Sequence, residues 1–211
     1  YHQRPNSKPK GANACRNYGF EISNGEYVNW FDDDDVMLAN FLEVKINVLN
    51  HNVDFVIVSG YFVDSNLERD SEIEIFQTSE LFKDYVKWNI KVLTPSVLFK
   101  RAFLFKKELF LTKIKRGQET ELFSRLFFQV KSSQYMIIEE YVFLYRQHEM
   151  TKTVKNKSYI NEYVESQTYI AVENFKKSFK INDLELINHY YLLLLNIFFK
   201  GLENKHFSNS R

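Results

Sequence analysis

The sequence predicts an α/β fold in which helices flank a mixed β-sheet, followed by a helical C-terminal region. Up to about residue 152, short apolar runs of strand length alternate with amphipathic stretches of helical length. Beyond that point only helical periodicity remains, over residues 159–179 and 183–202. We therefore expect an α/β domain over residues 1–152 and a helical region over residues 153–211.

The composition supports one sizeable core and excludes several classes of protein. Of 211 residues, 45% are hydrophobic, and 20 Phe and 13 Tyr provide enough apolar surface to offset the entropy lost on folding. The 28 basic and 27 acidic residues nearly cancel, so the charge does not call for a nucleic acid as partner. A single cysteine excludes a disulfide framework and favours a reducing compartment, the cytoplasm.

The first part of the chain predicts two helices and two strands. Residues 17–26 predict the start of a helix that gives way to a turn at Asn24-Gly25. The run EYVNWF, residues 26–31, has the length and composition of a strand. Apolar residues over 36–52 are consistent with a helix packed on a sheet, and FVIVSGYFV, residues 55–63, predicts a buried strand.

The middle of the chain continues the alternation. Residues 72–76 predict a short strand and residues 80–89 a helix. Residues 97–105 fit a strand or a helix, because periodicity alone does not decide. Residues 119–130 carry apolar side chains at helical spacing, and residues 137–145 predict a further strand.

Four consecutive carboxylates, Asp32 to Asp35, directly follow the apolar run EYVNWF. Two unit charges about 4 Å apart repel by roughly 4 kcal/mol at an effective dielectric constant near 20, unless solvent screens them or a ligand binds. Oxygen ligands at the end of a buried strand suit Mg²⁺ or Mn²⁺ bridging to a phosphate. The alternative is an acidic first turn of the following helix. The residues alone leave both interpretations open.

Three segments around this acidic run resemble one protein family. ACRNYG (residues 14–19), GEYV (25–28) and FDDDD (31–35) are similar in order and spacing to a segment of the family 2 glycosyltransferases. That resemblance implies a GT-A fold and an inverting transfer from a nucleotide sugar. Cys15 departs from the small residues usual before the arginine, and we expect a buried cysteine there.

The resemblance implies a donor site with a bound Mn²⁺ or Mg²⁺. The residues that it assigns to the metal are Asp32 and Asp34, with Asp35 beside them, and those that it assigns to the donor are Arg16, Asn17, Asp32 and Asp33. A guanidinium near a diphosphate is chemically sensible because its fork matches phosphate oxygens. Without the resemblance, Arg16 would be interpreted as capping a helix end.

A second similar segment carries the expected catalytic base. GQETELF, residues 117–123, resembles the G-x-[ED] motif that starts the acceptor-side helix of the family, and Glu119 is the matching carboxylate. An inverting transfer needs one base to take the proton of the acceptor hydroxyl. Glu121 is the competing candidate, and an acidic first turn of a helix is the structural alternative for both.

A third similar segment, YRQHEMT (residues 145–151), resembles the end of the catalytic domain in many relatives. There the resemblance makes His148 a candidate ligand of the metal or diphosphate, with Arg146 in support. From the residues alone, a single histidine is more often structural or on the surface.

Together these segments imply a metal-dependent transferase that moves sugar, most often from a UDP-sugar, to a glycan or lipid-linked glycan in bacterial surface polysaccharide synthesis. The similarity covers about residues 10–152 and lacks the N-terminal βαβ part of the family, which indicates a truncated chain. The alternative is a non-catalytic binding module. For the C-terminal helices we weigh packing on the catalytic domain, peripheral contact with the inner face of the plasma membrane, and a homodimer.

Overall fold

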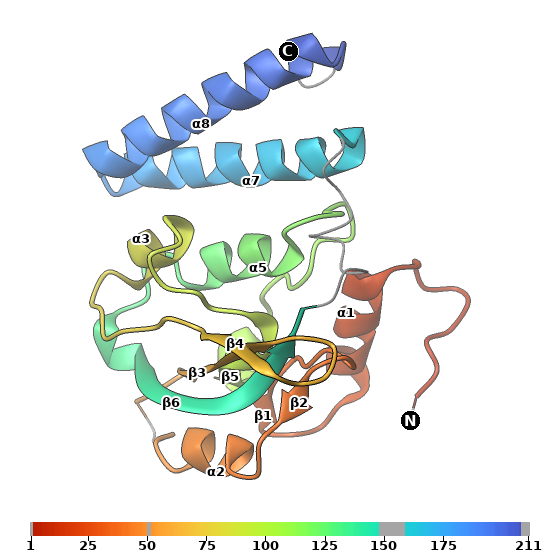
Figure 1. Ribbon diagram of the computed structural model, residues 1–211, viewed down its shortest axis with the longest axis vertical. Helices are drawn as coiled ribbons and strands as arrows, with labels where there is room; N and C mark the ends of the chain where they lie inside the picture. The colour runs from red at the N-terminus through yellow and green to blue at the C-terminus, as the bar shows by residue number, and fades with distance from the viewer. Residues whose placement is uncertain (1, 50–51, 148–158, 208–211) are drawn as a thin grey trace.

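A computed structural model describes residues 2–49, 52–147 and 159–207, and it shows a curled mixed sheet flanked by helices (Figure 1). The strands are β1 (Tyr27–Val28), β2 (Val36–Met37), β3 (Phe55–Val63), β4 (Arg69–Glu72), β5 (Val97–Lys100) and β6 (Tyr135–Arg146). The helices are α1 (Ala12–Ile22), α2 (Phe41–Ile46), α3 (Leu81–Val86), α4 (Arg101–Leu104), α5 (Gln118–Leu126), α7 (Asn161–Lys180) and α8 (Leu184–Glu203).

Strand β3 is the centre of the sheet, whose order is β1-β5-β3-β6-β2 with β4 beside the second half of β3. β3 pairs in parallel with β6 and antiparallel with β5. A side chain at Gly60 would place its Cβ 2.5 Å from the Phe143 carbonyl oxygen, so only glycine lets β6 cross so closely. Both faces of β3 are covered, which explains why its sequence is apolar without alternation.

The main core lies on the face of the sheet that α5 covers, and it is mostly aromatic. The ring of Phe55, in β3, has its centre 5.3–5.7 Å from those of Phe99, Phe103, Phe127 and Tyr135. Each such pair contributes about 0.5–1.5 kcal/mol beyond the area that it buries. The high aromatic content of the chain is thus used in the layer between the sheet and α5.

Helix α2 packs on the opposite face through Phe41, near Phe143 of β6 (Figure 1). It also buries Lys45 completely. The Lys45 Nζ donates to Asn29 Oδ1 at 2.6 Å and to the Pro95 carbonyl at 2.7 Å, and it lies 3.6 Å from the centre of the Phe41 ring. Burial lowers the pKa of Lys45 to about 6, so the amine is held as a neutral donor near pH 7.

Helices α7 and α8 form a hairpin stacked on α3 and α5 (Figure 1). Ala171, Leu186, Tyr190 and Ile197 belong to the same core cluster as the sheet residues, so the C-terminal helices share the main core. Asp183 begins α8 by accepting a hydrogen bond from the Leu186 N–H at 3.0 Å. Among the described helices, none is long and apolar enough to cross a membrane.

Several expected elements have different boundaries or types. The helix expected over 36–52 is replaced by β2 and the short helix α2, because Val36 and Met37 pair with β6. The strand expected over 26–31 is limited to β1, and the strand expected over 72–76 lies earlier, as β4. The ambiguous stretch 97–105 is both a strand and a helix, β5 followed by α4.

Other expectations hold closely. β3 has the predicted bounds, and α5, β6, α7 and α8 lie within a few residues of the predicted stretches. The prediction that Cys15 is buried is wrong, because it lies on the exposed side of α1.

Candidate active site

Arg16, on α1, contacts the first aspartate of the acidic run. Its Nη2 donates to Asp32 Oδ1 at 2.7 Å, and its guanidinium carbon lies 5.2 Å from the centre of the Phe110 ring. The Trp30 indole nitrogen donates to the Arg16 carbonyl at 3.4 Å. These contacts hold α1 directly beside the acidic run, so a positive charge lies next to the carboxylates rather than at a helix end.

The acidic run itself forms a turn. The Asp35 N–H donates to the Asp32 carbonyl at 3.3 Å, and this turn leaves Asp33 and Asp34 exposed. The run therefore does not form the first turn of a helix, because α2 begins only at Phe41. The roles of Asp32, Asp33 and Asp34 in holding a donor or a metal stay predictions.

Asp35 is the carboxylate of the acidic run whose hydrogen bonding is incomplete within the described chain. Its Oδ1 accepts the Arg146 backbone N–H at 3.0 Å, whereas its Oδ2 is buried and has no hydrogen-bond partner among the described residues. Burial above all, and then Asp34 and Asp32, raise the pKa of Asp35 to about 7 against the opposing Arg146 hydrogen bond. The Arg146 Nε is also buried without a partner in the described chain. A buried acceptor and a buried cationic donor, on two residues joined by a backbone hydrogen bond, thus remain without a partner among the described residues.

These residues fit a cation that arrives with a phosphate ligand. Among the described residues, no three His, Cys, Asp or Glu side chains converge as a ligand set. Mg²⁺ is typically bound by one or two carboxylates plus substrate phosphates and water, not by a cage of protein ligands alone. The open Asp35 Oδ2, with the exposed Asp34 beside it, matches that donor set.

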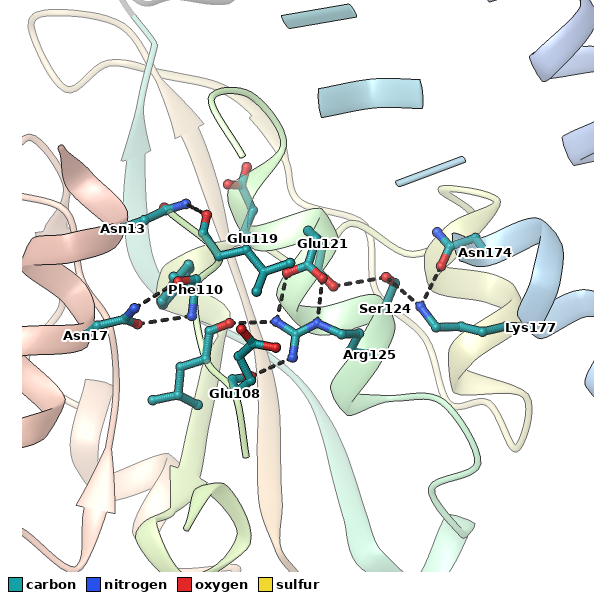
Figure 2. A network of polar contacts seen from close by, with 12 residues as sticks. Asn13, Asn17, Glu108, Phe110, Glu119, Glu121, Ser124, Arg125, Asn174 and Lys177 are labelled. Atoms are coloured by element: carbon teal, nitrogen blue, oxygen red, sulfur yellow. Dashed lines mark hydrogen bonds and ion pairs between the residues drawn. The ribbon is translucent and has the colours of Figure 1, made fainter. Parts of the chain in front are cut away.

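Asn17, expected in the donor site, is used as a brace. Its Nδ2 donates to the Phe110 carbonyl at 2.8 Å and its Oδ1 accepts the Phe110 N–H at 3.0 Å (Figure 2). One turn earlier, Asn13 Nδ2 donates to the Leu111 carbonyl at 2.6 Å. The two amides fix the segment around residue 110 to α1, and a contact of Asn17 with a donor stays a prediction.

The same segment is fixed from the other side by α5 (Figure 2). Glu121 is 3% exposed and forms an ion pair with Arg125, whose Nη2 lies 2.7 Å from Glu121 Oε2. The Arg125 guanidinium also donates to the carbonyls of Glu108 and Leu109. Glu121 is therefore committed to holding α5 against this segment and is not available as a base.

Glu119 has the opposite environment. It lies in the first turn of α5, after Gly117, whose φ of 72° lets the chain turn into the helix. Its carboxylate forms no ion pair or hydrogen bond with the described part of the chain, and it lines an open cavity of about 900 Å³ between α5 and helices α7 and α8. Of the two candidates, Glu119 is the carboxylate that a substrate could reach.

The hydroxyl of Tyr145, near the end of β6, is influenced by the negative charges of both the acidic run and Glu119. Burial first, and then the negative charges of Glu119, Asp35, Asp32 and Asp34, raise the pKa of the Tyr145 hydroxyl. The phenol thus lies within electrostatic range of both the acidic run and Glu119. Tyr145 lies within YRQHEMT, where the sequence predicts no role for it, and only the pairing of β6 with β2 places it here.

The last expected site residue, His148, lies outside the described residues. Its neighbour Arg146 is described, and its backbone holds Asp35 as given above. A contact between His148 and a metal or diphosphate stays a prediction.

The chain matches one family model, and its fold is similar to solved structures. Residues 2–112 match the model described as Glycosyl transferase family 2. Crystal structures of S. aureus TarS 1-349, with and without UDP-GlcNAc, share 14% sequence identity and have TM-scores of 0.50. These alignments cover 75% and 76% of this chain but only 45% and 44% of the TarS chains. No curated protein sequence matches.

These comparisons bear on the fold class and on the extent of the chain. The expected GT-A-like fold, with its mixed sheet and flanking helices, is confirmed by the similarity to TarS. This chain spans less than half the length of those structures.

Proposed function

The chain belongs to glycosyl transferase family 2, and on this premise we propose that it moves a sugar from a UDP-sugar to a hydroxyl group of a glycan, with inversion at the anomeric carbon and with Mn²⁺ or Mg²⁺ bound. The observation that carries the proposal is a pair of buried atoms at the acidic run, Asp35 Oδ2 and Arg146 Nε, that have no hydrogen-bond partner among the described residues. A carboxylate oxygen and a guanidinium N–H that both lack partners in the described chain are the complement of a cation–diphosphate pair, which would favour the ionised form of Asp35.

The donor is proposed as a UDP-sugar because of chemistry and fold together. One of the TarS structures contains UDP-GlcNAc. In this chain, Arg16 and Arg146 place two guanidinium groups beside the acidic run, and the guanidinium fork matches phosphate oxygens. Asp35 and Asp34 would hold the cation, whose chemistry is to neutralise the charge that develops on the leaving diphosphate.

The acceptor side is supplied by Glu119. Its carboxylate takes the proton of the attacking hydroxyl, while the new bond forms at the anomeric carbon and the bond from that carbon to the diphosphate oxygen breaks. Attack opposite the leaving group inverts the anomeric centre. Tyr145, half-buried and within electrostatic range of both acidic groups, helps to exclude water from the space between donor and acceptor.

Titration calorimetry of UDP with and without Mn²⁺ tests the donor site. We expect UDP to bind the purified protein more tightly with Mn²⁺, and Asp35→Asn to remove that gain. Asp70→Asn, an exposed aspartate on β4, is the matched control and should behave as the wild type. If the wild-type protein binds no UDP with or without Mn²⁺, the proposal is wrong. If it binds UDP but releases no sugar from UDP-GlcNAc, a non-catalytic binding module is the better description.

A further inference from the structure

The cavity beside Glu119 is built by α5 and by the hairpin of α7 and α8, which follows α5 later in the sequence. Its floor is the segment that leads into α5, including Glu119, and its walls come from α7 and α8. Its volume of about 900 Å³ lies at the upper end of the 300–1,000 Å³ typical of ligand sites. It is therefore large enough for a ligand of more than one sugar unit, one end of which can touch Glu119.

The walls carry side chains that suit a ligand rich in hydroxyl groups. Gln167 on α7 and Asn196 on α8 both line the cavity, and neither amide is hydrogen-bonded within the described chain. An amide offers two donors and one acceptor, which matches a hydroxyl group in either role. Tyr163 and His189 add flat aromatic surface to the same walls.

The walls are also fixed relative to Glu119. The Lys115 N–H, just before α5, donates to Ser166 Oγ on α7 at 2.9 Å. Further along, the Lys177 Nζ donates to Asn174 Oδ1 on α7 at 2.9 Å and to Ser124 Oγ on α5 at 3.4 Å (Figure 2). A ligand that binds the walls would thus be presented to Glu119 without a large rearrangement.

We propose that this cavity binds the acceptor as a hydroxyl-rich glycan chain, with Gln167 and Asn196 as specificity-determining residues. The C-terminal helices are then part of the active site and not an appendage. This inference rests on the proposed transfer reaction, because it takes Glu119 as the group that receives the acceptor proton. It adds where the acceptor chain lies and which residues of α7 and α8 recognise it.

The test uses three neutral tetrasaccharides: maltotetraose, cellotetraose and chitotetraose. Each is titrated into the protein with UDP and Mg²⁺ present, and the side-chain amide signals of Gln167, Asn196 and Asn188 are followed by NMR. Asn188 is the internal control, since it is an exposed asparagine on α8 that does not line the cavity. We expect at least one tetrasaccharide to shift the Gln167 and Asn196 signals and to leave Asn188 unmoved.

Two variants sharpen the result. Asn196→Ala should weaken binding of that tetrasaccharide about three- to tenfold, the effect of one hydrogen bond, whereas Asn188→Ala should leave it unchanged. If none of the three sugars shifts the cavity signals, or if the two variants weaken binding equally, the inference is overturned. Calorimetry of UDP with the same samples separates the two proposals: intact UDP binding without sugar binding rejects only the acceptor cavity, and sugar binding without UDP binding rejects only the transferase.

Discussion

The acidic run and the first turn of α5 both carry neighbouring carboxylates, but they differ in how completely those carboxylates are paired. In α5, Glu121 is buried in an ion pair with Arg125, which also donates to two backbone carbonyls. In the acidic run, Asp35 keeps one buried oxygen without a partner among the described residues, and its pKa is raised to about 7.

This difference distinguishes carboxylates that stabilise the fold from carboxylates that are open to a ligand. A buried polar group normally has its hydrogen bonds satisfied, because leaving one unmet costs about 1–3 kcal/mol. The α5 network follows that rule and stabilises the fold. The acidic run breaks it, and the same free energy would be recovered when a cation and a phosphate bind. Glu119, two residues before Glu121, belongs with the acidic run, since its carboxylate faces a cavity.

The largest expected effect comes from replacing Glu119 and Glu121 of α5 by glutamine in two separate variants. Glu119→Gln should lower the rate of sugar release from UDP-GlcNAc by about 10²–10⁴-fold with unchanged stability, because a general base contributes that much. Glu121→Gln should instead destabilise the fold by about 1–3 kcal/mol, since it removes the buried counter-charge of the half-buried Arg125. Steady-state kinetics and urea unfolding measure the two effects.

The contrast between Glu119 and Glu121 is wrong if the two variants have the same effects on turnover and on the unfolding midpoint. A Glu121→Gln protein that keeps its wild-type unfolding midpoint but loses turnover would make Glu121 the base. Asp84→Asn is not a suitable control, because Asp84 accepts hydrogen bonds at the end of α3. Glu139→Gln, an exposed carboxylate on β6, is suitable and should change neither quantity.

Much of the fold could be predicted because it depends on local pattern. β3 is a continuous apolar run between polar segments, and α7 and α8 have clear helical periodicity, so their place in the sequence was evident. Residues 36–52 were mistaken for one helix because the strand pairing of Val36 with Leu144 is set by a residue more than a hundred positions away. Local spacing contains no information about such a partner.

The residues of the candidate site could be proposed only in part from local pattern, and their roles stay predictions. The acidic run, Arg16 and Glu119 stand out because short segments resemble a family. The distinction between Glu119 and Glu121 could not be made, since it depends on Arg125 reaching back to both Glu121 and the Glu108 carbonyl. Tyr145 could not be singled out, because nothing in YRQHEMT shows that its hydroxyl lies within electrostatic range of acidic groups from two other segments.

Lys45 is a buried amine that is hydrogen-bonded only to uncharged acceptors within the described chain. Lys45 has both of its neutral N–H groups bound, yet within the described chain its hydrogen bonds reach no carboxylate, and burial lowers its pKa to about 6. Between pH 6 and 10.5 the unfolded chain binds more protons than the folded one, so stability should rise with pH across this window. Lys45→Met should stabilise the protein by about 1–2 kcal/mol at pH 6.5, because the folded wild-type protein must release a proton that the unfolded lysine keeps, whereas methionine has none to release.

Urea unfolding at pH 6.5 and pH 9 measures this effect. The advantage of Lys45→Met should shrink at pH 9, because the wild-type protein then loses less by deprotonating the amine. Lys131→Met, an exposed lysine before β6, should show no such dependence. An advantage that is equal at both pH values would mean that Lys45 keeps its charge in the fold.

The smallest effect concerns Asp35 in the protein without metal. Its pKa is raised from 3.8 to about 7 on folding, so between these values the folded chain holds a proton that the unfolded chain has lost. Stability should therefore fall as pH rises through this window, and the cost stays in full above pH 7.

Asp35→Asn removes the titration and keeps an oxygen to accept the Arg146 N–H. In the presence of EDTA, its melting temperature should exceed that of the wild type by a few degrees at pH 8 and match it at pH 4.5, whereas Asp70→Asn should follow the wild type at both. Added Mg²⁺ and UDP should then reverse the order at pH 8, because only the wild-type carboxylate can use the bound cation. An Asp35→Asn protein that is less stable than the wild type at pH 8 in EDTA would show that the carboxylate is already satisfied within the fold, and the contrast between a paired scaffold and an unpaired site would not hold.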